Sequence, residues 1–108
     1  MNVMPLTDNY SVTAQISADD IAAIAAAGFK SIICNRPDQE SADQPDFATI
    51  DAAAQAAGLK TAYIPITGMP SPEQTADMAQ ALSDLPAPVL AYCRTGNRSS
   101  IIFNAAQA

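Results

Sequence analysis

The hydrophobic positions along the chain follow two spacings, one typical of helices and one typical of buried strands. Apolar residues at helical spacing predict four helices, over residues 17–28, 46–58, 71–85 and from about Arg98 to 108. Short continuous apolar runs predict strands at residues 29–34, 59–66 and 89–92. Helices and strands that alternate in this way favour an α/β domain with a mainly parallel sheet and helices on both faces.

The ends of the predicted helices carry recognisable signals. Ser17, Asp46 and Ser71 stand just before the helical patterns, where a side-chain oxygen can accept a hydrogen bond from a free backbone N–H. Gly28 and Gly58 follow two of the patterns, as expected of glycines that end helices. We therefore predict N-caps at the first three positions and helix ends at the two glycines.

The segment before the first helix favours a hairpin at the edge of the sheet. Residues 2–6 and 10–16 are strand-like, and the polar stretch 7–9 lies between them. With 108 residues, of which 49% are hydrophobic, the chain can bury one core, so we predict a single domain over residues 1–108.

Composition and charge exclude several classes of function. The net charge of −6 disfavours binding to nucleic acid, because the phosphate backbone attracts basic surfaces. No apolar run approaches the roughly 20 residues that a membrane span needs, and the start of the chain lacks the pattern of a signal peptide, so we expect a cytoplasmic protein. With two cysteines and no histidine, a zinc site of the usual Cys/His type is excluded; we expect no metal and no cofactor.

The sequence "AYCRTGNRSS", residues 91–100, predicts a thiolate held in an anion-binding loop. Cys93 comes directly after a predicted strand and before a predicted helix, whose N-terminus offers free N–H groups and roughly half a positive charge. These groups and the nearby arginines should lower the pKa of the Cys93 thiol, which makes it the candidate nucleophile. The predicted anion-binding loop consists of Arg94, Thr95, Gly96, Asn97, Arg98 and Ser99.

The pattern Cys93, Gly96, Arg98 resembles the Cys-x-x-Gly-x-Arg loop of single-domain rhodanese sulfurtransferases. The whole chain, through "TAQIS", "GFKSIICNRPDQE", "YIPI" and "AYCRTGNRS", resembles the phosphatase-like domain family of beta-lactamase-hydrolase-like proteins over residues 3–107. This resemblance implies a fold similar to that of protein tyrosine and dual-specificity phosphatases. The family is also named as a sulfur transferase family, with relatives fused to persulfide dioxygenase or flavin-dependent disulfide-oxidoreductase domains, which implies a partner of one of these kinds.

Three departures from the phosphatase pattern favour sulfur transfer. Four residues separate Cys93 from Arg98, where phosphatases have five, so the ring of N–H groups should be smaller. Tyr92 precedes the cysteine instead of histidine, and Thr67 and Gly68 stand where a general acid is expected. We therefore predict a sulfurtransferase that carries sulfane sulfur as a Cys93 persulfide, with a small-molecule or protein thiol or persulfide as substrate.

Two other functions remain open. In the alternative, the protein hydrolyses a phosphoester through a Cys93 thiophosphate, and Arg98 stabilises the equatorial oxygens. In the third, the loop binds an anion or a partner without catalysis. Phosphate release, sulfur transfer and the absence of both would distinguish the three.

Three residues carry two interpretations each. Arg36, after a neighbouring strand, either reaches the anion or pairs with Asp38 or Glu40 in its own loop. Cys34 is either a core residue or a resolving thiol beside Cys93. Ser99 either donates a hydrogen bond to the thiolate or caps the last helix.

Overall fold

Five strands form one sheet in a computed structural model that describes residues 1–108. The strands are β1 (Met4–Thr7), β2 (Tyr10–Thr13), β3 (Ser31–Cys34), β4 (Lys60–Tyr63) and β5 (Val89–Tyr92). Their order is β1-β2-β5-β3-β4; β2, β5, β3 and β4 run parallel, and β1 pairs antiparallel with β2 at the edge. The mainly parallel sheet and the edge hairpin are confirmed; β5 matches its hydrophobic pattern, and the other four strands are shorter than theirs.

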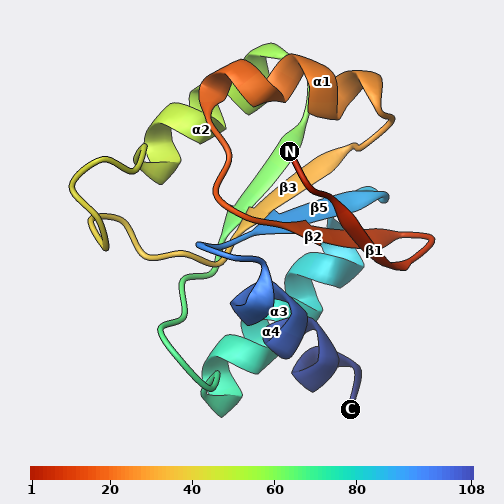
Figure 1. Cartoon of the computed structure of the whole chain (residues 1–108). Coiled ribbons are helices and arrows are strands. Elements are labelled where there is room, and N and C mark those ends of the chain that lie inside the picture. Colours follow the sequence, from red (N-terminus) through yellow and green to blue (C-terminus); the bar gives the residue numbers. More distant parts are fainter.

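Helices cover both faces of this sheet. The elements are a short 3-10 helix η1 (Ala18–Asp20), α1 (Ile21–Ala26), α2 (Phe47–Ala56), α3 (Pro72–Asp84) and α4 (Asn97–Gln107). In Figure 1, α1 and α2 lie on one side of the sheet and α3 and α4 on the other. None of these helices has the length and apolar character needed to cross a membrane. The predicted two-sided α/β architecture is therefore confirmed.

The central strands are apolar throughout because both of their faces are buried. Along β3, Ile32 packs into the cluster under α1 and α2, while Ile33 packs into the cluster under α3 and α4. Leu90 and Ala91 alternate in the same way along β5. Successive side chains on a strand point to opposite faces, so a short unbroken apolar run is what a covered parallel strand requires.

The side-chain cap predicted for α3 is present, whereas the cap of α2 differs from the prediction. The Ser71 hydroxyl accepts a hydrogen bond from the Gln74 N–H at 3.1 Å, and the Gln74 side chain accepts one from the Ser71 N–H at 2.8 Å. Asp46 is the N-cap of α2, as predicted, but its side chain accepts no hydrogen bond from the helix; the Asp38 carboxylate instead accepts one from the Phe47 N–H at 2.8 Å. A carboxylate from the preceding loop thus replaces the local one.

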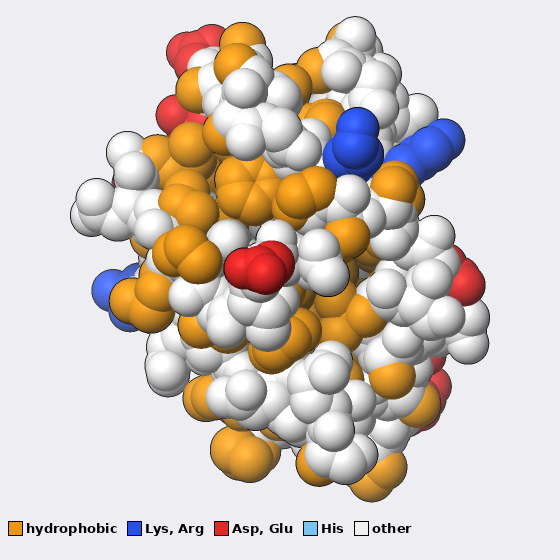
Figure 2. All heavy atoms as spheres, turned by 90° about the vertical axis from the view of Figure 1, so that its right-hand side faces the viewer, with side chains coloured by type: hydrophobic (Ala, Val, Ile, Leu, Met, Phe, Trp, Pro, Cys, Tyr) orange, Lys and Arg blue, Asp and Glu red, His pale blue; other side chains and the backbone are white.

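The parallel strands place the two ends of the sheet on opposite sides of the molecule. The loops that follow β3 and β5 leave on the left of Figure 1, where the carboxyl ends of these strands meet. Figure 2 shows the opposite side, where hydrophobic side chains gather in patches with few charged ones among them. The loops that follow β3 and β5 therefore lie together at the carboxyl ends of the parallel strands, away from this more apolar side.

Candidate active site

The loop from β5 into α4 curls around the sulfur of Cys93. Gly96 is the N-cap of α4 and has a left-handed backbone, with φ of 94°. In this conformation the Gly96 N–H donates to the Cys93 sulfur at 3.0 Å. A Cβ atom at Gly96 would lie 3.5 Å from the backbone of Thr13, so space allows it, but the backbone angle disfavours any residue with a side chain. Glycine is therefore required by the conformation that aims this N–H group.

The loop favours the ionised form of Cys93. Burial of the thiol acts to raise its pKa, but hydrogen bonds from the backbone N–H groups of Ser99, Thr95 and Gly96 and from the Ser99 hydroxyl outweigh burial. The net effect lowers the pKa of the Cys93 thiol below its ordinary value. The predicted thiolate-stabilising loop is thus present in the structure.

Ser99 lies beside the thiol and does not cap the helix. Its hydroxyl is fully buried and has no oxygen or nitrogen partner. Gly96 occupies the N-cap, so Ser99 does not cap α4; its buried hydroxyl instead helps to lower the pKa of the Cys93 thiol. The Tyr10 hydroxyl donates to the Ser99 carbonyl at 3.0 Å and holds this turn of α4 against β2.

Replacing Ser99 with alanine is expected to raise the pKa of the Cys93 thiol, because the ionised sulfur loses a hydrogen-bond donor while its burial is unchanged. The thiolate absorbs in the ultraviolet, so a pH titration of absorbance measures the shift directly. Ser100→Ala is the matched control, since the Ser100 hydroxyl donates to the Gly96 carbonyl at 3.2 Å and not to sulfur. A titration midpoint in Ser99→Ala equal to that of the parent would contradict the assignment.

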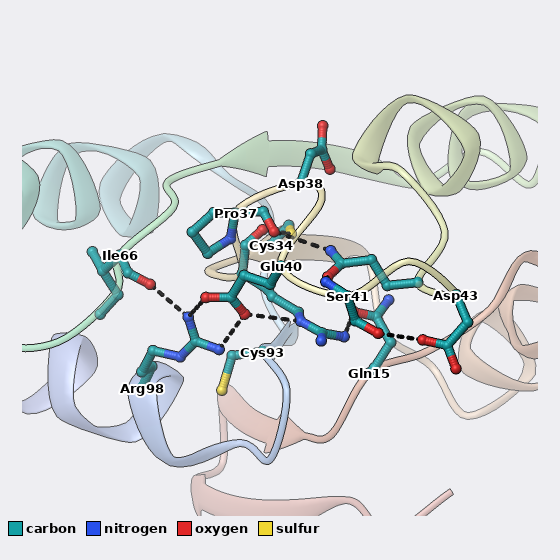
Figure 3. Close-up of polar contacts among 12 residues, drawn as sticks. Gln15, Cys34, Pro37, Asp38, Glu40, Ser41, Asp43, Ile66, Cys93 and Arg98 are labelled. Carbon is teal, nitrogen blue, oxygen red and sulfur yellow. Dashed lines mark hydrogen bonds and ion pairs between the residues drawn. The ribbon is translucent and has the colours of Figure 1, made fainter.

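Arg98 points across the loop toward an acidic side chain from another part of the chain. Its two terminal nitrogens donate to the two carboxylate oxygens of Glu40 at 2.7 and 2.8 Å, and one also donates to the Ile66 carbonyl at 2.8 Å (Figure 3). The Glu40 hydrogen bond is the main cause of the raised pKa of Arg98, and contact with Cys93 adds to it. The predicted anion-binding arginine therefore lies beside the thiol but is already paired.

Arg36 pairs within its own loop, as one of its two interpretations expected. Its Nε lies 3.0 Å from the Glu40 carboxylate, and its NH1 donates to the Gln15 side chain at 3.0 Å. The side chain is nearly buried. Arg36 and Arg98 together lower the pKa of Glu40 below its ordinary value, with the Arg98 hydrogen bond as the larger cause. Glu40 therefore bridges two of the three arginines at this edge of the sheet.

A polar cleft of about 620 Å³ opens above these residues. No apolar side chain lines it; the lining residues are Arg36, Glu40, Ser41, Thr67, Arg94 and Arg98. Arg94 is exposed and has neither an ion pair nor a hydrogen bond from its side chain, so it is the free cation of the cleft. Thr67 lines the cleft after β4, at the position where the sequence lacks a general acid. Of the loop residues, Asn97 donates its N–H to the Thr95 hydroxyl at 3.3 Å, which shapes the turn.

Cys34 does not face Cys93. It pairs in register with Tyr92, and paired residues of neighbouring parallel strands share a face, so Cys93 points to the opposite one. Both thiols are free, and that of Cys34 donates to the Arg36 carbonyl at 3.2 Å. Burial raises the pKa of Cys34 above its ordinary value. The core interpretation fits this environment, and a resolving role for Cys34 stays a prediction.

Sequence reasoning missed the part that Glu40 plays at the site. The spacing of Arg36 and Glu40 indicated a pair within the loop, but the second contact joins residues 58 positions apart. A carboxylate four residues after an arginine, in a loop that follows a parallel strand, was the available signal. Only the tertiary structure shows that this carboxylate reaches the Cys93 loop.

Solved structures of similar shape define the class of this domain. A candidate phosphatase from Neisseria meningitidis matches with a TM-score of 0.88 and 36% identity over 95% of this chain and 74% of that chain. TpbA from P. aeruginosa, solved in complex with pTyr, matches with a TM-score of 0.69 and 15% identity over 94% of this chain and 59% of that one. The second likeness concerns the fold. The protein has the fold of tyrosine and dual-specificity phosphatases.

The family follows from the sequence. The model of the phosphatase-like domain of beta-lactamase hydrolase-like proteins matches residues 2–108, and the chain belongs to that family. A beta-lactamase hydrolase-like protein from Agrobacterium fabrum is 32% identical over 106 residues, which cover 95% of this chain and 24% of the relative. The relative from Xylella fastidiosa strain Temecula1 is 29% identical over 104 residues, again 24% of its length. The chain thus spans about a quarter of these relatives.

Proposed function

We propose that the protein is a cysteine-dependent phosphatase-like hydrolase that cleaves phosphate monoesters through a Cys93 thiophosphate. One observation carries the proposal: the Cys93 thiol lies inside a ring of N–H groups that lower its pKa, with the Arg98 guanidinium beside it. The likeness to the candidate phosphatase from Neisseria meningitidis and the phosphatase-like family support this chemistry over sulfur transfer, which the sequence alone favoured.

The residues present can carry out two displacements at phosphorus. In the first, the Cys93 sulfur forms a bond to phosphorus while the bond from phosphorus to the ester oxygen breaks. In the second, water attacks the thiophosphate, which releases inorganic phosphate and restores the thiolate. Loop N–H groups and Arg98 stabilise the charge that develops on the equatorial oxygens.

The lack of a proton donor for the leaving oxygen restricts the class of substrate that we propose. Thr67 follows β4 where phosphatases of this fold place an acid, and the Glu40 carboxylate is held ionised by its two arginines. No group in the cleft is thus ready to give a proton to a leaving alkoxide. Aryl phosphates leave as phenoxides, which need this proton least, so they are the proposed substrate class.

Sulfur transfer is the second candidate, favoured by the short spacing between Cys93 and Arg98 and by Thr67. The thiolate would attack the outer sulfur of thiosulfate, forming a Cys93 persulfide while the S–S bond breaks and sulfite leaves; a thiol then takes the sulfur. In this candidate, a persulfide dioxygenase or a disulfide oxidoreductase is the proposed partner.

Two parallel assays test the proposal. The purified protein is incubated with an aryl phosphate, and released phosphate is measured; a second sample receives thiosulfate and cyanide, and thiocyanate is measured. We expect phosphate release that depends on Cys93, with little thiocyanate. Thiocyanate without phosphate would replace the proposal with sulfur transfer, and no turnover in either assay would favour an anion-binding module.

A further inference from the structure

The feature that the proposed reaction leaves unused is the side chain of Arg94. All three arginines of the chain line the polar cleft. Arg36 and Arg98 share the carboxylate of Glu40, which is the only carboxylate in the lining. Arg94 is exposed and its side chain forms no ion pair, although the chain carries 11 Asp and Glu residues. One cation of the cleft is therefore free to bind an anion that enters from outside.

The nucleophile is held by groups other than Arg94. Backbone N–H groups of the loop and the Ser99 hydroxyl bind the Cys93 sulfur, and Arg98 contacts it. No hydrogen bond joins the Arg94 side chain to this sulfur, which is buried, whereas Arg94 is exposed. The Nε atom of Arg98 donates no hydrogen bond within the protein, so it remains available for an oxygen of the substrate. A phosphate group beside Cys93 thus has its partners without Arg94.

Arg94 starts from the side of the cleft opposite Arg98. In Figure 3, Arg98 lies on one side of Cys93 and Gln15 lies on the other. The Gln15 N–H donates to the Arg94 carbonyl at 3.4 Å, and the Gln15 side chain accepts from Arg36 at 3.0 Å. The backbone of Arg94 is therefore fixed beside Gln15. The cleft thus has two separate cationic positions, one at Arg98 beside the nucleophile and one at Arg94.

The cleft is larger and more polar than the phosphate ester of an unsubstituted ring requires. Its volume of about 620 Å³ lies within the range of about 300–1,000 Å³ that is typical of sites for whole small ligands. Such sites are mostly apolar, but no apolar side chain lines this one. The part of the ligand beyond the phosphate should therefore be polar or charged. The guanidinium of Arg94 offers a planar pair of donors and one positive charge, which match the two oxygens and single charge of a carboxylate.

We propose that Arg94 is a specificity-determining residue that binds a carboxylate on the leaving group, so that the substrates are aryl phosphates with a carboxylate on the ring. This inference rests on the proposed function for the phosphate group beside Cys93. The carboxylate subsite at Arg94 does not itself depend on the reaction at sulfur. Because the two cationic positions are separate, phosphate and carboxylate bind together, and the Arg94 contact determines which end of the ligand faces Cys93.

The test compares two ligands that differ in the charge on the ring: the phosphate ester of para-hydroxybenzoate and that of para-hydroxybenzamide. Each is titrated by calorimetry, at constant ionic strength, into Cys93→Ser, which cannot turn over. The parent should bind the carboxylate ester more tightly than the amide ester. Adding Arg94→Gln is expected to lower the ratio of the two affinities by at least about fivefold. Any effect of Arg94 on the phosphate group is common to both ligands and cancels in this ratio.

Lys60→Gln is the matched control, because it removes the same charge from an exposed cation at the start of β4, outside the cleft. The ratio of affinities in this variant should equal that of the parent. A ratio that Arg94→Gln leaves unchanged, or a parent that does not prefer the carboxylate ester, would overturn the inference. A ratio that falls as expected, in a protein whose unmodified form releases phosphate from neither ester, would support the carboxylate subsite and overturn the proposed hydrolysis.

Discussion

Replacing Cys93 with serine is expected to reduce turnover by at least about a thousandfold, to the level of the background reaction. A serine hydroxyl in the same place stays protonated, because the ring of N–H groups that lowers the pKa of a thiol cannot ionise an alcohol near neutral pH. The measurement is kcat/KM for the substrate that the two assays identify, together with mass spectrometry for a covalent intermediate on the protein.

Cys34→Ser provides the comparison for this experiment. Its thiol lies on the other face of the sheet and has a raised pKa, so the variant should form the covalent intermediate on Cys93 as the parent does. Loss of sulfur delivery to an acceptor, with the intermediate still formed, would instead reveal the resolving role that the sequence left open. An intermediate that survives in Cys93→Ser would show that another residue is the nucleophile.

Replacing Arg98 with lysine is expected to lower kcat/KM by about a hundredfold. Arginine presents a rigid planar pair of donors that fits two oxygens of a phosphate, whereas lysine offers one point charge on a flexible chain. The loss should fall mainly on kcat, since Arg98 lies beside Cys93, where charge develops as the bond to phosphorus changes.

Arg94→Lys is the comparison for Arg98→Lys, because Arg94 lines the same cleft but is exposed and unpaired. Its conservative replacement should mainly raise KM, and by a smaller factor. Both variants keep the net charge of the chain, so any difference between them reflects position and geometry. Equal losses in the two variants would contradict the separate role given to Arg98.

Features that depend on neighbours in the sequence could be predicted reliably. The Ser71 cap and its reciprocal bond with Gln74 lie within one turn, and the glycine at position 96 is needed by the turn it occupies. Asp46 takes the predicted N-cap position but makes no side-chain bond to the helix, since Asp38, nine residues before Phe47, accepts from the Phe47 N–H. A sequence shows which residues can cap a helix, but not which competitor the fold brings there.

The same distinction applies to the site. The nucleophile and its loop follow from a strand, a cysteine and a glycine that leads into a helix, all within residues 89–100, because backbone N–H groups of one turn necessarily surround the sulfur. The choice between sulfur and phosphate chemistry could not be predicted from the sequence, because the spacing of Cys93 and Arg98 does not show which substrate the cleft binds. The structural likeness to a candidate phosphatase and the match to the phosphatase-like family favour the phosphatase-like alternative.

The sequence by itself determined the two-sided parallel sheet, because covered strands must be apolar on both faces, and it located the thiolate, because its stabilising groups are local. Only the tertiary structure decided that Cys34 turns away from Cys93 and that Glu40 pairs with Arg98. These relations depend on the register of strands and on contacts across 58 positions of the chain, which local patterns do not encode.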